Sequence, residues 1–296
     1  MRGQSTVASS RVSINSGIGG SRRAAAMRKS AQRRSLPLEF GHMDALLERT
    51  FEAEQHHFWF RGFRRFVAPL IEEATAGRSN PRLLDAGCGT GANLPLLQHY
   101  GTTFGLELFW RGIRFGHDRG LPRLIQGSVT HLPFGNESFE VVLSFDVLYC
   151  LETPAEQSAL QEMFRVLKPG GFAVINVAAL EILKGDHSAL GGEVRRYTKR
   201  ELRTKLERAG LRVKRLTYTN ASLFPITATV RVLQRMRGVK AGGDNRGDFY
   251  VPPAPINALF AGALALESKI VEAGINMPVG SSLLCLAKKP GFQTGD

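Results

Sequence analysis

The stretch Leu83-Leu84-Asp85-Ala86-Gly87-Cys88-Gly89-Thr90-Gly91 decides the fold, because it joins a strand-like apolar segment, an acidic residue and three alternating glycines. Apolar residues of this kind suit a buried parallel strand, and the glycines remove the Cβ atoms that would keep a ligand from the backbone. A helix that follows such a loop directs free N–H groups and a positive dipole end toward the ligand. The stretch therefore predicts a nucleotide-cofactor loop.

Asp85 distinguishes between two cofactor classes. The run Gly87 to Ala92 also fits the dinucleotide pattern, with alanine in the last glycine position. A carboxylate two residues before the first glycine would repel a pyrophosphate, whereas it can hold the ammonium group of an amino-acid cofactor. Asp85 therefore favours S-adenosylmethionine over a dinucleotide.

Four later segments follow the loop in a fixed order: Thr103 to Glu107, Gly127 to Val129, Phe139 to Ser144 and Glu162 to Phe172. Together with the loop they resemble the class I S-adenosylmethionine-dependent methyltransferases, and in particular their type 11, small-molecule branch. The resemblance covers residues 58 to 220 and, more weakly, the last strand. It implies an α/β fold with a Rossmann-like, seven-stranded, mostly parallel sheet, helices on both faces and an antiparallel last strand.

The resemblance also implies a set of cofactor-binding residues. Glu107 ends the second strand, where a carboxylate can accept hydrogen bonds from both hydroxyls of a ribose. Ser128 stands where many members have an acid, so its adenine contact is expected to be weaker, and packing is the simpler role for Cys88. The full set is Asp85, Gly87, Cys88, Gly89, Thr90, Gly91, Asn93, Glu107, Leu108, Ser128, Val129, Phe145 and Arg61.

The aromatic and basic run from His56 to Phe66 admits two interpretations. Arg61 or Arg64 could pair with the methionine carboxylate while Trp59 and Phe60 exclude water. Alternatively, the run is an amphipathic helix that packs on the edge of the sheet.

Methyl transfer from a sulfonium requires a general base only when the acceptor arrives protonated. Candidate catalytic residues are His187, Arg196 and Tyr197, which follow the fifth strand in a segment where Gly-Glu replaces the branch's Gly-His. The alternative is a solvated, basic start of a helix. No metal site is expected, because Cys88, Cys150 and Cys285 are far apart in the sequence. Their odd number and wide spacing also argue against a disulfide scaffold, which favours a reducing compartment.

The predicted function is methyl transfer to a small-molecule acceptor, with an apolar or lipid-like acceptor among the options. A nucleic-acid methyltransferase is disfavoured, because Ser144-Phe145-Asp146-Val147 lacks the paired prolines and aromatic that grip an extruded base. An NAD(P)-dependent oxidoreductase and a non-catalytic cofactor-binding partner remain alternatives. The acceptor and the oligomeric state stay open.

The basic character of the chain belongs mostly to its first residues. The 296 residues carry a net charge of +13 and are 43% hydrophobic, enough for one substantial core. Residues 1–38 hold eight basic residues and no acid, and we expect this tail to be disordered. Three accounts are open: a transit peptide, a start codon placed before Met27 or Met43, and an arm for nucleic acid or anionic membrane. The expected location is cytoplasmic, or organellar with a transit peptide.

The remaining chain divides into a helical cap over residues 39–80, a cofactor-binding core over 81–219, a helical insertion over 220–280 and a last strand with a tail over 281–296. The insertion is apolar and basic from Leu223 to Met236, and Ile256 to Ala273 is predicted to be helical. It suits a lid over an apolar acceptor, an anionic membrane contact, or a packed layer or dimer contact. Its longest apolar stretch, Ile256 to Leu266, is shorter than the roughly twenty residues that span a bilayer.

Overall fold

The computed structural model of the chain describes residues 40–184, 192–236 and 250–291. The basic tail over residues 1–38 and the candidate base His187 lie outside this part, as does the middle of the insertion. The predicted cap, core, insertion and last strand all belong to one compact unit that starts at Phe40.

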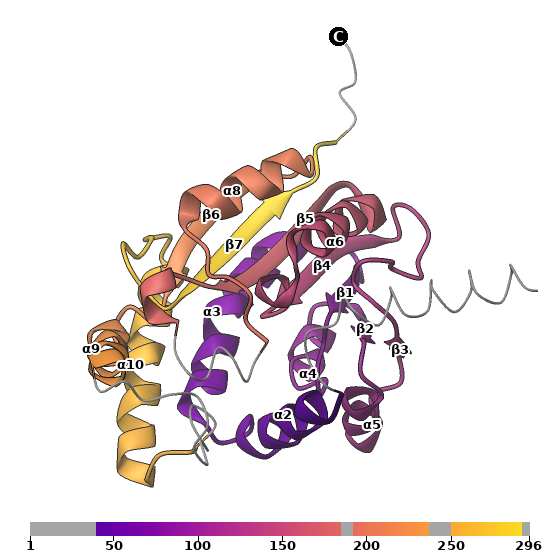
Figure 1. Ribbon diagram of the computed structural model, residues 1–296. Coiled ribbons are helices and arrows are strands. Elements are labelled where there is room, and N and C mark those ends of the chain that lie inside the picture. The colour runs from indigo at the N-terminus through magenta and orange to yellow at the C-terminus, as the bar shows by residue number, and fades with distance from the viewer. Residues whose placement is uncertain (1–39, 185–191, 237–249, 292–296) are drawn as a thin grey trace, which may run out of the picture. The chain divides into compact units, whose positions relative to one another are not determined.

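A single seven-stranded sheet forms the centre of this unit (Figure 1). The strand order is β3-β2-β1-β4-β5-β7-β6, and only β7 runs antiparallel to its neighbours β5 and β6. The predicted sheet with an antiparallel last strand is therefore confirmed. The strands are β1 (Arg82–Ala86), β2 (Thr102–Glu107), β3 (Leu124–Gln126), β4 (Phe139–Phe145), β5 (Leu167–Ala178), β6 (Arg212–Thr219) and β7 (Ser282–Lys288).

One face of the sheet is covered by α3 (Phe58–Thr75), α4 (Leu94–Gln98) and α10 (Ala254–Glu272). The stripe Phe66, Leu70 and Ile71 of α3 is buried against Leu83 of β1 and Val141 of β4. The backbone N–H of Trp59 donates to Nδ1 of His57, which caps the start of α3 at 3.1 Å. Helix α3 therefore packs on the face of the sheet over its central strands and not on its edge, and the cofactor contact of Arg61 or Arg64 stays a prediction.

The opposite face is covered by α6 (Thr153–Val166) and α8 (Lys199–Arg208). Leu160 and Met163 of α6 and Leu202 of α8 are buried in this layer. Thr198 begins α8 through a capping box with Glu201, which confirms the cap predicted there. Gly210 follows the helix with a φ of +93°, a conformation that favours glycine.

Helices α2 (Phe40–Ala53) and α5 (Trp110–Asp118) pack on each other near the carboxyl ends of the first strands. The rings of Phe51 and Phe115 stack with centroids 4.3 Å apart, and Glu48 forms an ion pair with Arg111 at 2.5 Å. Residues 39–80 thus hold two helices, α2 and α3, as their periodicity predicts. Two short 3-10 turns, η1 (Leu148–Cys150) and η2 (Glu181–Leu183), follow β4 and β5.

The insertion between β6 and β7 contains α9 (Phe224–Met236) and α10. Helix α10 packs along α3, where Gly62 permits close approach because an added Cβ would lie 2.5 Å from Cδ1 of Leu264. Helix α10 thus packs on the rest of the unit, and the role of the insertion stays a prediction. The helix extends beyond the apolar stretch Ile256 to Leu266. By length and composition alone it could cross a membrane. Nothing else in the described part of the chain indicates that it does.

Candidate functional site

The three glycines of the loop after β1 serve different purposes. Gly87, Gly89 and Gly91 have φ values of +90°, +56° and +77°, which L-residues with side chains rarely adopt. An added Cβ would collide with Val147 at Gly87 and with Leu121 at Gly91, so both glycines permit close packing. At Gly89 the nearest side-chain atom lies 4.0 Å away, on Leu47. Gly89 is therefore the position where a ligand can approach the backbone.

Asp85 lies buried at the end of β1 without a counter-charge. It is 1% exposed, and neither carboxylate oxygen has a hydrogen-bond partner among the described residues. Burial, together with the negative charge of Glu107, raises the pKa of Asp85 to about 7. A buried carboxylate without a partner is costly, so the site is suited to a cationic ligand.

Glu107 links the end of β2 to the glycine loop. Its Oε2 accepts from the backbone N–H of Gly89 at 2.9 Å, and its Oε1 accepts from that of Phe109 at 2.9 Å. Gly112 of α5 leaves the room for this arrangement, since an added Cβ would lie 2.8 Å from Cγ of Glu107. Each carboxylate oxygen has a second acceptor site, so Glu107 can still bind a diol.

Thr90 is held by a residue that the sequence does not single out. Its hydroxyl donates to the carboxylate of Glu54, just after α2, at 2.7 and 2.8 Å. Arg119, after α5, forms an ion pair with the same carboxylate. Burial raises the pKa of Glu54, against the lowering effect of Thr90 and Arg119. The Thr90 hydroxyl is thus already bonded within the protein. Only the backbone of Thr90 is left for the predicted cofactor contact.

The segment after β3 carries the residues predicted to face the adenine. Ser128 and Val129 are half-buried, and Leu108, directly after β2, is exposed. The Ser128 hydroxyl bonds to Oγ1 of Thr130 at 2.8 Å and accepts from the Thr130 N–H at 3.2 Å. Ser128 therefore shapes its own turn, consistent with a weaker adenine contact.

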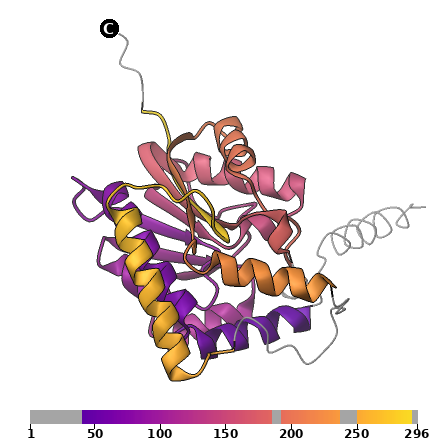
Figure 2. The same cartoon turned by 90° about the vertical axis from the view of Figure 1, so that its left-hand side faces the viewer.

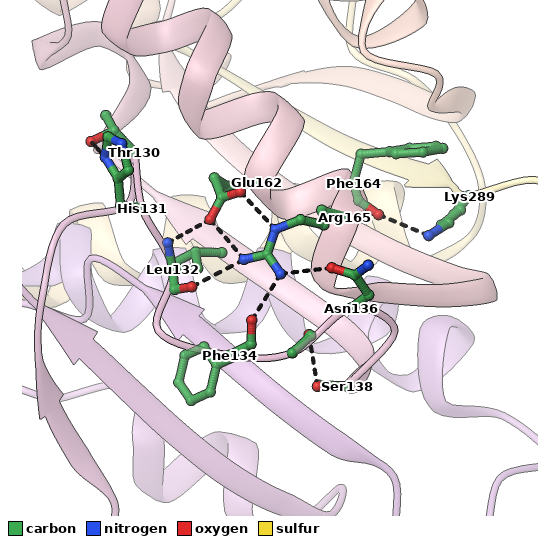
Figure 3. Close-up of polar contacts among 11 residues, drawn as sticks. Thr130, His131, Leu132, Phe134, Asn136, Ser138, Glu162, Phe164, Arg165 and Lys289 are labelled. Carbon is green, nitrogen blue, oxygen red and sulfur yellow. Dashed lines mark hydrogen bonds and ion pairs between the residues drawn. The ribbon is translucent and has the colours of Figure 1, made fainter.

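Arg165 of α6 holds the loop that continues from this segment, as Figure 3 shows. Its guanidinium pairs with Glu162 and donates to the carbonyls of Leu132 at 3.0 Å and Phe134 at 2.8 Å. Glu162 in turn accepts from the N–H of Leu132 at 2.7 Å. A forked guanidinium fixes this loop more firmly than a single amine could.

The remaining predicted cofactor residues lie around the loop and α3. Cys88 is buried, and burial raises the pKa of its thiol, which agrees with a packing role. Phe145 packs edge-on against Phe63 of α3 with centroids 5.0 Å apart, so its ring belongs to the core. Asn93 precedes α4, and Arg61 is exposed on α3. Their cofactor contacts stay predictions.

Asp146 lies directly after β4, at the same edge of the sheet. Its φ is +60°, and its Oδ1 accepts from Nδ2 of Asn176, on β5, at 2.9 Å. Burial and the nearby charge of Glu193 raise the pKa of Asp146 to about 7, against the lowering effects of Asn176 and Arg196. Oδ1 of Asn176 is buried and has no hydrogen-bond partner among the described residues. The sequence gives no signal for this pair, because Asp146 follows β4 whereas Asn176 lies on β5.

Two of the predicted catalytic residues have structural partners. Arg196 forms a forked ion pair with Glu193 at 2.6 and 2.9 Å. Tyr197 is 1% exposed, and its hydroxyl donates to Glu156 at 2.5 Å. The ring of Tyr197 is thus part of the core, and the catalytic roles of Arg196 and Tyr197 stay predictions. His187 lies outside the described residues, and its role stays a prediction.

Residues 84–175 match a family model described as a methyltransferase domain. This match covers the glycine loop, Glu107, strand β4 and most of β5. Residues 84–175 therefore form an S-adenosylmethionine-dependent methyltransferase domain. The predicted family and its cofactor are thereby confirmed. Within the described part of the chain, no group of His, Cys, Asp and Glu residues could hold a metal ion.

Curated relatives share part of this methyltransferase domain. The chain is 32% identical over 138 residues to phthiotriol/phenolphthiotriol dimycocerosates methyltransferase 1 of Mycobacterium ulcerans, covering 44% of this chain and 50% of the relative. It is 33% identical over 138 residues to tRNA (carboxymethyluridine(34)-5-O)-methyltransferase of Arabidopsis thaliana, covering 46% and 33%. The chain thus spans about half of the first relative and a third of the second.

Two solved structures share the fold of the methyltransferase domain. One is a chain from a complex between the Haloferax volcanii Trm112 methyltransferase activator and a methyltransferase, with a TM-score of 0.55 and 17% identity over 86% of this chain and 99% of that chain. The other is the cyclase SpnF, with a TM-score of 0.50 and 20% identity over 77% and 81%. One fold serves different reactions, so the acceptor chemistry must be argued from the site.

Proposed function

We propose that this protein transfers the methyl group of S-adenosylmethionine to an oxygen atom of an apolar small molecule. The observation that carries the donor half is the buried pair Asp85 and Glu107, which has no cation among the described residues. A dinucleotide would bring a pyrophosphate toward these two carboxylates, whereas S-adenosylmethionine brings an ammonium and a sulfonium. The electrostatics of the loop therefore favour a methyltransferase over an oxidoreductase.

The proposed donor contacts follow from the geometry of the loop. Asp85 would hold the ammonium group, Glu107 the ribose hydroxyls and Leu108 with Val129 the two sides of the adenine. Gly89 leaves open space where the donor meets the backbone. When bound, the cofactor supplies a methyl group activated by the positive sulfur, and the protein's task is to hold acceptor and donor in line.

On the acceptor side, we assign the proton transfer to Asp146. A hydroxyl loses its proton as it accepts a methyl group, and a base works best with a pKa near the working pH. Asp146 has a pKa of about 7 and lies at the carboxyl edge of β4, next to Val147, which abuts the glycine loop. Asn176 bonds to the Asp146 carboxylate. Glu193 and Arg196 pair with each other, and their charges act on Asp146.

The oxygen acceptor has further support from a relative. The name of the Arabidopsis thaliana relative specifies a 5-O position, and that of the Mycobacterium ulcerans relative specifies phthiotriol/phenolphthiotriol dimycocerosates. These names differ in acceptor class, and the apolar class is favoured here by the exposed apolar residues between Ile226 and Leu233 on α9 and between Ile256 and Leu266 on α10.

The test offers the full chain two acceptor pools with tritium-labelled S-adenosylmethionine: a total lipid extract and bulk tRNA. We expect the label to enter the organic phase, and Asp85→Asn to abolish the transfer. Label precipitating with tRNA would overturn the apolar acceptor. Calorimetric binding of NAD(P) without binding of S-adenosylmethionine would overturn the methyltransferase itself. Donor binding without transfer to either pool would favour the non-catalytic partner.

A further inference from the structure

Helices α9 and α10 direct apolar side chains outward. The exposed residues of α9 include Ile226, at 52% exposure, and those of α10 include Leu259 and Leu266, at 68% and 69%. We define the outer helical face by the exposed residues Pro225, Ile226, Thr229, Val230, Val232 and Leu233 of α9 and Pro255, Ile256, Ala258, Leu259, Gly262 and Leu266 of α10. No residue of this face is charged.

Two polar side chains of α10, those of Asn257 and Glu267, point inward. Asn257 donates to the carbonyl of His56 at 2.9 Å and accepts from the N–H of Phe58 at 2.8 Å. Glu267 is 3% exposed and accepts from the N–H groups of Ala221 and Ser222 at 2.9 and 2.8 Å. A helix that faces water carries its polar residues outside, so α10 has the reverse pattern as far as Ser268, and beyond it Lys269 and Glu272 are exposed.

Both helices lie on the side of the molecule that Figure 2 turns toward the viewer. There α9 is orange and α10 is yellow-orange, and the sheet lies behind them. Their apolar residues therefore face outward on one side of the molecule. The hydrogen bonds of Asn257 join α10 to the start of α3, and that of Glu267 joins it to the segment just before α9. Helix α10 therefore lies flat on the protein, which suits contact with a surface.

The outer helical face offers few hydrogen bonds to a partner. A protein interface carries about one hydrogen bond per 100–200 Å². Here the side chains supply only the Thr229 hydroxyl, which already donates to the carbonyl of Pro225 at 2.8 Å. Lipid chains form no hydrogen bonds, so this surface fits lipid better than a second protein.

The charges near the outer helical face complement an anionic surface. The described residues from 220 to 266 contain no Asp or Glu. Arg61 and Arg65 are exposed on α3, the helix against which α10 packs. Basic residues beside an apolar helix surface are typical of helices that lie in the interface of an anionic membrane.

We propose that α9 and α10 dock this protein on an anionic membrane, with the outer helical face inserted at the level of the lipid headgroups. The inference goes beyond methyl transfer, since it rests on the surface of the insertion and not on the cofactor site. If the proposed apolar acceptor is correct, docking would bring the site to a substrate dissolved in the bilayer.

The first experiment is co-sedimentation of the full chain with phosphatidylcholine vesicles, with and without phosphatidylglycerol. We expect sedimentation with the anionic vesicles, and about tenfold weaker binding for Leu259→Ser/Leu266→Ser and for Ile226→Ser/Val230→Ser. The matched control is Trp110→Ser on α5, which removes a side chain of 57% exposure outside this face and should bind like the parent. Equal thermal melting and S-adenosylmethionine affinity in all variants would show that each has folded.

The second experiment excludes binding by the basic tail alone. Leu266→Trp, in a Trp59→Phe/Trp110→Phe background, should be quenched by vesicles that contain brominated lipid, because a residue inserted among the chains meets the bromine atoms. Absence of sedimentation by the full chain, or sedimentation without this quenching, would overturn the proposal. A dimer in light scattering that both serine pairs convert to a monomer, without lipid binding, would assign the face to a second copy instead. None of these outcomes depends on methyl transfer, so this proposal and the proposed function fail separately.

Discussion

The hydroxyl of Thr90 donates to the carboxylate of Glu54 inside the protein, at 2.7 and 2.8 Å from its two oxygens. Thr90 belongs to the cofactor loop, and Glu54 follows α2. The bond therefore ties the first helices to the loop, and Arg119 closes the connection from α5 through its ion pair with Glu54. The position of α2 and the shape of the loop depend on each other.

Replacing Thr90 by valine should destabilise the protein by about 1–3 kcal/mol, because the buried carboxylate of Glu54 loses a donor. Urea unfolding measures the change. The matched control is Thr102→Val, whose hydroxyl bonds to Asn80 in an exposed pair and whose loss should have little effect. Equal stability in the two variants would contradict the coupling. Weaker binding of S-adenosylmethionine should accompany the loss in Thr90→Val alone.

Binding of S-adenosylmethionine should tighten as the pH rises toward neutrality. The pKa of Asp85 is raised to about 7, so the free protein holds this group largely protonated at about pH 6 and half ionised at about pH 7. The cationic donor prefers the ionised form, and its affinity should rise up to about tenfold per pH unit below that pKa. Calorimetry at about pH 6 and about pH 7.5 measures the effect.

Asp85→Asn should bind the donor more weakly and lose this pH dependence. The exposed Asp118→Asn of α5 serves as the control and should behave like the parent. A parent affinity that is flat between these pH values would argue against Asp85 as the ammonium site.

Methyl transfer to the lipid extract should accelerate as the pH rises through about 7, since Asp146 acts as a base only when ionised. Asp146→Asn should lose the rising limb of the pH profile and most of the rate, while it still binds S-adenosylmethionine. The exposed Glu152→Gln provides the control. A profile of the same shape in Asp146→Asn would remove this residue from proton transfer.

The close contact of α3 and α10 should be sensitive to a single methyl group. Gly62→Ala places a Cβ 2.5 Å from Cδ1 of Leu264, and overpacking of this kind costs about 1–3 kcal/mol. Gly262→Ala on α10 meets open space and should instead stabilise the helix by up to about 1 kcal/mol. Chemical denaturation compares the two. Gly62→Ala should cost less in a Leu264→Ala background than in the parent, because the clashing Cδ1 is then absent. No difference between the two alanine variants would contradict this packing.

The sheet and the cofactor loop could be predicted from the sequence because each depends on neighbouring residues. The apolar strands, the alternating glycines and the Thr198 cap are local patterns, and all are present in the structure. The Thr90 and Glu54 pair and the Asp146 and Asn176 pair depend on contacts between distant segments, which no local pattern reveals. The burial of Tyr197 beside Glu156 depends on such contacts too, since Tyr197 and Glu156 are 41 residues apart.

The last residue of β6, Thr219, lies opposite the first residue of β7, Ser282. The chain therefore leaves the sheet and returns to it at one point, and an excursion of any length between them leaves the strand register unchanged. Loop closure makes longer excursions only slightly less favourable, by about 0.6 kcal/mol for each doubling. In evolutionary terms, this junction is a place where descendants of one ancestor can exchange α9 and α10 for other segments, and so acquire new acceptors, while they inherit the donor site intact.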